Sequence, residues 1–193
     1  MKSIKIEIPD GKKAEWINGV LTLVDEKDSR PVTERIKSFE EACNELGEKH
    51  NTVWAYKELL SFATREDFLV EDFGKDVVAY LKLRIIAAAL NEGWEPQFTE
   101  DEYRWFPWFY LYTEEELAEK SEEWKKEHAL VLWGGAAGCG AYCGLAFADS
   151  GPAFSDSYAS VGARLAVKSE ELAVYFGKQF SELWADFYVT TKR

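Results

Sequence analysis

The sequence predicts an α+β domain in which a mixed or antiparallel sheet is packed by two helices, and three observations lead to this class. Residues 75–91 form an apolar segment of helical length, residues 170–188 carry an amphipathic helical stripe, and residues 103–112 and 129–133 have the composition of strands. We expect the sheet to combine the aromatic strand with the strands that follow it. A chain of 193 residues fits one domain.

The N-terminal region is predicted to hold a short strand and a β-hairpin. Residues 4–8 alternate apolar and charged side chains and precede Pro9-Asp10-Gly11. Asn18-Gly19 separates two β-prone runs and supplies the positive φ angles that a type I′ turn requires. We therefore expect a single domain over residues 1–193, with residues 1–35 as a peripheral strand and hairpin.

Helices are predicted from residue 38 onward. Ser38-Phe39-Glu40-Glu41 is a capping box that opens a helix to about Lys49. Residues 52–72 are expected to hold a second short helix and a loop. Residues 75–91 are apolar around the whole helical projection, which is typical of a buried helix, and Gly93 is placed to cap its end.

The middle of the chain changes from aromatic to polar. Residues 99–102 look like a helical start that Pro107 interrupts, and residues 103–112 place aromatics on both alternating faces. This pattern favours a strand that is buried or covered on both sides. Thr113 then caps a polar, solvated helix to about Glu127.

Three more strands and a helix are expected in the last third. Residues 129–133, 142–147 and 161–167 have strand composition, and a glycine-rich loop follows the first of them. Residues 146–150 and 153–157 are similar to each other, which indicates two strand ends or turns of similar geometry. The helix over 170–188 has one continuous apolar stripe, formed by Leu172, Tyr175, Phe176, Phe180, Leu183, Trp184, Phe187 and Tyr188.

Charge and composition narrow the classes of partner. The net charge is −12, and residues 1–127 carry −11 of it. Such a surface repels a polyanion, so we expect no direct nucleic-acid partner. Neither an apolar leader nor a segment of membrane-spanning length is evident, and three cysteines do not suggest a disulfide framework. These features predict an intracellular protein with reduced thiols.

No catalytic, metal or cofactor residue can be assigned from the motifs. The glycine loop ends without the Gly-Lys-Ser/Thr of a phosphate-binding loop. Cys139 and Cys143 could supply two zinc ligands, but Cys43, His50 and His128 do not complete a spaced set. Acidic pairs are too abundant for any one of them to indicate carboxylate catalysis.

Aromatic side chains are the candidate binding residues. Trp105, Trp108, Trp133 and Tyr142 lie on or beside predicted strands near glycine-rich loops. Rings in such positions can stack on sugars or anchor a protein partner, or they can fill the core. We take these four as candidate ligand-binding residues.

Three segments carry a resemblance to a known group of proteins. They are residues 80–94 (YLKLRIIAAALNEGW), 161–165 (VGARL) and 175–180 (YFGKQF). The chain resembles a group of short, uncharacterised acidic proteins encoded by phages and mobile elements of gut bacteria, and the likeness spans most of its length. A weaker likeness, carried by Trp133-Gly134-Gly135 and Ala163-Arg164-Leu165, is to C-type-lectin-like modules used for surface recognition; the terminal helix departs from that pattern.

The leading hypothesis is a non-enzymatic binding or accessory protein of a phage or mobile element that recognises a protein or a glycan. Its expected location is the host cytoplasm, with virion association open, and its oligomeric state is open. The alternative is an acidic, charge-mimicking inhibitor of a host DNA-binding protein. An enzyme that uses Glu or Asp without a metal ranks last, because no constellation of residues can be named for it.

Overall fold

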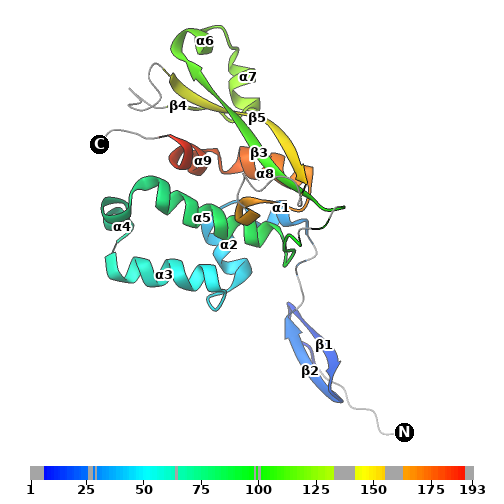
Figure 1. The fold of residues 1–193 in the computed structure, drawn as a ribbon. Helices are drawn as coiled ribbons and strands as arrows, with labels where there is room; N and C mark the ends of the chain where they lie inside the picture. Colours follow the sequence, from blue (N-terminus) through cyan, green and yellow to red (C-terminus); the bar gives the residue numbers. More distant parts are fainter. Residues whose placement is uncertain are drawn as a thin grey trace. The chain divides into compact units, whose positions relative to one another are not determined.

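The computed structural model describes residues 7–25, 28, 30–63, 65–97, 99, 101–132, 142–154 and 163–189 (Figure 1). The chain divides into two compact units, Met1–Pro31 and Val32–Arg193. Antiparallel sheets, an N-terminal hairpin and C-terminal helices packed on the larger sheet confirm the predicted α+β class. The described residues are referred to below as the described chain.

The N-terminal unit contains the predicted hairpin. Strands β1 (Lys12–Ile17) and β2 (Val20–Asp25) pair antiparallel, with Ile17 opposite Val20. Asn18 and Gly19 have φ angles of 50° and 80°, as a type I′ turn requires. Of the strand predicted over residues 4–8, residues 7 and 8 are not in a strand and the others lie outside the described chain.

Five helices open the larger unit, and the second of them has the predicted capping box. Ser38 Oγ accepts from the Glu41 backbone N–H at 3.1 Å, and Glu41 Oε2 accepts from the Ser38 N–H at 3.0 Å. The expected single helix and loop over residues 52–72 is corrected to two helices. In order, the elements are α1 (Val32–Arg35), α2 (Phe39–Leu46), α3 (Asn51–Ala63), α4 (Glu66–Phe73) and α5 (Lys75–Leu90).

Helix α5 is the buried helix that the sequence predicts. Eight of its sixteen residues are buried, because apolar side chains surround its axis. It ends in a turn where Glu92 and Gly93 have φ angles of 50° and 87°. Asn91 then joins two distant parts of the chain, because its side chain donates to the Ala166 carbonyl at 2.8 Å and accepts from the Lys168 N–H at 3.1 Å.

The larger sheet has three antiparallel strands in the order β3-β5-β4, so the antiparallel alternative is correct. They are β3 (Tyr103–Thr113), β4 (Val131–Leu132) and β5 (Tyr142–Phe154). Of the strand expected over 161–167, residues 161 and 162 lie outside the described chain, and the rest is a 3₁₀ turn, η1 (Ala163–Leu165), followed by one bridge from Val167 to Trp105. No helix starts at residues 99–102 in the part of this segment that is described.

Two predicted helices are each divided in two. Thr113 caps α6 (Glu114–Ala118), but Ser121 caps a second helix, α7 (Glu122–Glu127), so the polar helix is not continuous. The terminal helix is α8 (Glu170–Gln179) and α9 (Ser181–Tyr188). The indole N–H of Trp184 donates to the Phe176 carbonyl at 3.3 Å, and the Phe180 N–H lies 3.4 Å from the same oxygen. A side chain that enters the helical ladder in this way bends the helix.

Helix α8 packs directly on the sheet at Gly177. A Cβ at this position would lie 2.6 Å from the Phe147 ring on β5 and 2.7 Å from Pro107 Cβ on β3. Only glycine therefore permits this approach. Figure 1 shows the resulting layers of the larger unit: the sheet, then α8 and α9, then α5 with the N-terminal helices.

The close approach at Gly177 predicts that Gly177→Ala destabilises the fold. Alanine in a helix ordinarily gains about 1 kcal/mol over glycine, but overpacking a core costs about 1–3 kcal/mol. We expect the urea unfolding free energy to fall by up to about 2 kcal/mol, the overpacking cost less the helical gain. Phe147→Leu in the same chain should recover part of that loss, as a double-mutant cycle would measure. A stabilised Gly177→Ala protein would contradict this packing.

A buried phenol predicts a loss of stability at high pH. Tyr56 is 4% exposed and donates to Glu66 Oε2 at 3.0 Å, and Lys82 donates to Glu66 Oε1 at 2.6 Å. Burial and then the Glu66 charge raise the pKa of Tyr56 well above its ordinary value. The phenol of the unfolded chain loses its proton near pH 10. The stability that the buried, protonated Tyr56 contributes is therefore fully present below about pH 10 and is progressively lost as the pH rises above it.

We expect Tyr56→Phe to reduce the fall in urea unfolding free energy between about pH 9 and pH 11. The matched control is Tyr110→Phe, which changes a phenol that is 65% exposed. Equal pH slopes in the wild-type and Tyr56→Phe proteins would contradict the assignment.

Candidate functional site

Strand β3 is an edge strand of the larger sheet. One of its sides pairs with β5 along its whole length. On the other side the only partner in the described chain is Val167, which exchanges two backbone hydrogen bonds with Trp105 at 3.0 and 3.1 Å. Two residues later stands Pro107, which has no N–H to donate. Proline inside a strand is confined to such edges.

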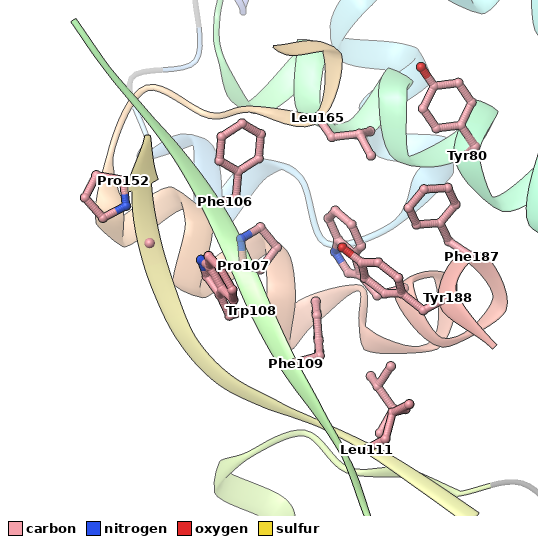
Figure 2. A pocket seen from close by; sticks show the side chains of 13 residues that line it. Tyr80, Phe106, Pro107, Trp108, Phe109, Leu111, Pro152, Leu165, Phe187 and Tyr188 are labelled. Carbon is pink, nitrogen blue, oxygen red and sulfur yellow. The ribbon is translucent and has the colours of Figure 1, made fainter. Parts of the chain in front are cut away.

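A cavity of about 610 Å³ lies beside this edge. Strand β3, with three residues of β5, forms one wall, helices α5 and α9 form the opposite wall, and η1 closes one end (Figure 2). The volume is in the range of sites that take a drug-sized molecule or a few amino-acid side chains. The lining residues are Tyr80, Phe106, Pro107, Trp108, Phe109, Leu111, Leu145, Gly151, Pro152, Leu165, Trp184, Phe187 and Tyr188.

The cavity borders both faces of β3 and reaches Leu145, Gly151 and Pro152 of β5. Consecutive strand residues point to opposite faces, and four consecutive residues, 106–109, line the cavity. The other edge of β3 is closed by β5. A space that touches both faces of β3 must therefore pass around its outer edge. Figure 2 shows the side chains of these residues around the strand, with Tyr188 and Phe187 across from it.

The opposite wall is a cluster of packed rings. Trp184 and Tyr188 are stacked, with their ring centroids 5.7 Å apart, and Phe109 lies 5.5 Å from Trp184 and 5.9 Å from Tyr188. Tyr80 on α5 stacks on Phe187 at 5.8 Å. Mutual contact among rings restricts their rotation, so the wall is preformed.

Polar groups on the cavity wall are few. No lining residue of the described chain is charged. The indole N–H of Trp184 already donates to the Phe176 carbonyl. The hydroxyls of Tyr80 and Tyr188 and the Trp108 indole N–H remain as side-chain donors, and desolvation raises the pKa of the Tyr188 phenol. The site can thus bury apolar surface and orient it through a few hydrogen bonds.

Of the four predicted binding residues, Trp105 and Trp108 are the two whose side chains belong to the described chain. Trp108 lines the cavity and is 60% exposed. Trp105 does not line it; this ring packs at the border of the core, 6.5 Å from Tyr103. Trp133 and the side chain of Tyr142 lie outside the described chain.

The prediction that β3 is covered on both sides is wrong beyond Pro107. Trp108 and Tyr110 are 60% and 65% exposed. The strand has aromatic residues at nearly every position, so alternation could not identify a solvent face. Trp108 is accommodated because it lies against Gly151 of β5, which has no side chain to displace the indole ring.

The sequence assigned the remaining wall residues to the core. Trp184, Phe187 and Tyr188 belong to the stripe of the terminal helix, and their spacing is the same whether a ring faces the core or a cavity. Tyr188 is 51% exposed. The available signal was an apolar stripe that continues to the exposed end of the terminal helix. It can be recognised as part of a cavity only when the tertiary structure is known.

Within the described residues, no three His, Cys, Asp or Glu side chains come together as metal ligands. Cys139 of the Cys139–Cys143 pair lies outside them. No described helix combines the length and apolar character that crossing a membrane requires.

No family model, curated protein or solved structure matches the chain. The functional argument therefore rests on the cavity and on the edge of β3.

The contact between Trp108 and Gly151 is testable with two alanine variants. Gly151→Ala should displace the Trp108 indole, shift its Nε1–H signal in a ¹H–¹⁵N spectrum, and cost under about 1 kcal/mol, since the ring is mainly exposed. The control, Gly144→Ala, brings a Cβ to 2.7 Å from Leu117 Cδ1 in the interior. It should cost about 1–3 kcal/mol and leave that signal in place. The reverse pattern would contradict the position of Trp108.

Proposed function

We propose that the protein is a non-enzymatic binding protein that takes apolar side chains of a protein partner into the cavity beside β3. The observation that carries this proposal is a preformed, ring-lined cavity of about 610 Å³ with no charged residue on its described wall. Partly exposed rings such as Trp108 and Tyr188 are the residue types that anchor protein interfaces. A titratable acid–base pair, which catalysis would use, is not supplied by the described lining.

A protein partner is favoured over a glycan by the polarity of the wall. Sugar rings stack on aromatics, but their hydroxyl groups need several hydrogen-bond partners when they are buried. The hydroxyls of Tyr80 and Tyr188 and the Trp108 indole N–H are too few for this task, and no charged side chain of the described wall adds to them. Apolar side chains need no such partners, and their burial gains about 25 cal/mol per Å².

The role as an accessory protein of a phage or mobile element is part of the same proposal. It is supported by the resemblance carried by residues 80–94, 161–165 and 175–180. A host-cell location and virion association are expectations of that resemblance, and the cavity is compatible with either.

Charge mimicry is the second candidate. Residues 1–31 carry six acidic and six basic side chains, so the whole net charge of −12 resides in Val32–Arg193. An acidic body of this kind could occupy a basic DNA-binding surface. Partner capture that weakens steeply with salt, and that ignores changes in the cavity, would favour this candidate.

The proposed site predicts saturable binding of a neutral apolar probe. We expect N-phenyl-1-naphthylamine to bind with one-to-one stoichiometry, measured by its fluorescence. Leu111→Trp should lower the affinity at least about tenfold by filling the cavity, a loss of about 1.4 kcal/mol.

The control is Leu132→Trp, which adds the same ring to a residue of β4 that does not line the cavity and is 64% exposed. Thermal unfolding checks that both variants are folded. Probe binding that does not saturate, or that both variants weaken equally, would overturn the proposal.

A further inference from the structure

The outer edge of β3 presents unpaired backbone groups along the cavity. Residues of an antiparallel strand direct their N–H and C=O alternately to one edge and the other. Trp105 points outward, because both of its backbone bonds go to Val167. Pro107, Phe109 and Leu111 share that orientation. The extra residue at the bulge between Trp108 and Phe109 lies on β5, where Ala148 is skipped, so the alternation of β3 continues. In the described chain, no backbone partner is seen for Phe109 and Leu111 on this edge.

The cavity lies where an added strand would place its side chains. Such a strand would run beside β3 at a spacing of about 4.8 Å. Every second side chain would point toward α5 and α9, into the space bordered by Tyr188, Phe187 and Leu165 (Figure 2). Backbone pairing gives affinity in this mode, and pockets for alternate side chains give specificity.

We infer that an extended segment of a protein partner adds to β3 as a fourth strand of the sheet. It runs antiparallel to β3, as Val167 does at Trp105, and ends near Leu165. Phe109 and Leu111 then each exchange two backbone hydrogen bonds with it, and its alternate apolar side chains fill the cavity. This inference rests on the proposed function and adds the binding mode to it.

Charge indicates that the segment is basic between its apolar residues. The body that presents β3 carries the whole net charge of −12. Helix α9, which forms part of the opposite wall, carries Glu182 and Asp186 and no basic residue, and Asp186 pairs with Lys75 of α5 at 2.5 Å. Lysine or arginine at the positions that do not enter the cavity would meet this acidic surface, and electrostatic attraction would increase the association rate.

A second copy of the chain is the less suitable occupant. Pairing β3 with β3 across a two-fold axis would bring together two bodies of the same charge.

The binding mode can be tested with displayed random nine-residue peptides selected against the full chain. We expect the enriched peptides to alternate apolar and basic residues. Saturation with an enriched peptide should slow amide exchange at Phe109 and Leu111 at least about tenfold, measured by ¹H–¹⁵N spectra. Tyr110 is the internal control, because its N–H points toward β5 by the same alternation.

Two matched comparisons, one between protein variants and one between methylated peptides, isolate the contribution of backbone hydrogen bonds to peptide binding. Leu111→Pro removes an outward N–H, whereas Leu111→Ala shortens the same side chain and keeps it. We expect Leu111→Pro to weaken peptide binding at least about tenfold relative to Leu111→Ala, with both proteins folded by circular dichroism. Methylation of a peptide backbone nitrogen whose N–H faces β3 should abolish binding. Methylation of an intervening backbone nitrogen should have little effect. The methylated peptides keep the test decisive if Leu111→Pro unfolds.

The outcomes separate the binding mode from the proposed function. If N-phenyl-1-naphthylamine binds in the cavity but the selection yields no peptide, or peptides indifferent to methylation, the added strand is wrong and the cavity proposal stands. If neither probe nor peptide binds, both are wrong. Protection of Phe109 and Leu111 that appears with rising concentration of the chain alone would identify a second copy as the occupant and overturn the partner segment.

Discussion

The close approach of α8 to the sheet at Gly177 determines the position of the other elements of the larger unit. Because the glycine has no side chain, α8 lies directly on Pro107 and Phe147. On the side away from the sheet, α8 is bonded to the segment that follows α1. There the Tyr175 hydroxyl donates to the Ile36 carbonyl at 2.6 Å, and the Gln179 side chain donates to the Lys37 carbonyl at 2.9 Å. The chain then bends where the Trp184 indole reaches the Phe176 carbonyl, and α9 takes a new direction. The sheet beyond Pro107 is therefore covered by α9 rather than α8, and the cavity lies between α9 and the outer edge of β3.

One end of that edge is closed by polar contacts that start on α5. The Asn91 side chain holds the segment of Ala166 and Lys168, and this places Val167 beside Trp105. Glu92 strengthens the junction by pairing with Lys168 at 2.9 Å and with the buried Arg35 at 2.5 Å. Arg35 also pairs with Glu45, and the hydrogen bond that its guanidinium donates to the Glu45 carboxylate raises the pKa of Arg35 despite the opposing effect of burial. Buried charges persist only when they are paired, so this network keeps the Val167 bridge in one place and limits the free edge to the residues after it.

Local signals in the sequence predict the elements whose geometry is decided within a few residues. Asn18-Gly19 sets the hairpin register, Ser38 and Thr113 cap the helices that begin after them, and the apolar segment of α5 is buried as expected. The errors arise where distant contacts decide the conformation. The apolar stripe over residues 170–188 is continuous, and the residue at the break, Phe180, is neither a glycine nor a proline that would predict a break. The division into α8 and α9 instead coincides with the hydrogen bond from Trp184 to the Phe176 carbonyl. The same holds for the site: the position of Trp108 on an aromatic strand makes it a candidate, but Tyr80 and Tyr188 line the same cavity only through the packing of α5 and α9.

An apolar cavity at an open strand edge exposes the protein to unwanted pairing with other chains, and other features of the chain oppose that pairing. Exposed edges invite pairing with other chains, and proteins protect them with proline, charge or short length. Strand β3 is long, but Pro107 interrupts its donors and the body that carries it has a net charge of −12. The charge opposes pairing between identical copies, whereas the missing N–H of Pro107 interrupts pairing with any added strand. In the proposed binding mode a basic segment is attracted rather than repelled, and it pairs with Phe109 and Leu111 beyond the proline. The acidic composition and the ring-lined edge then act together, because the charge disfavours self-association and favours a basic partner.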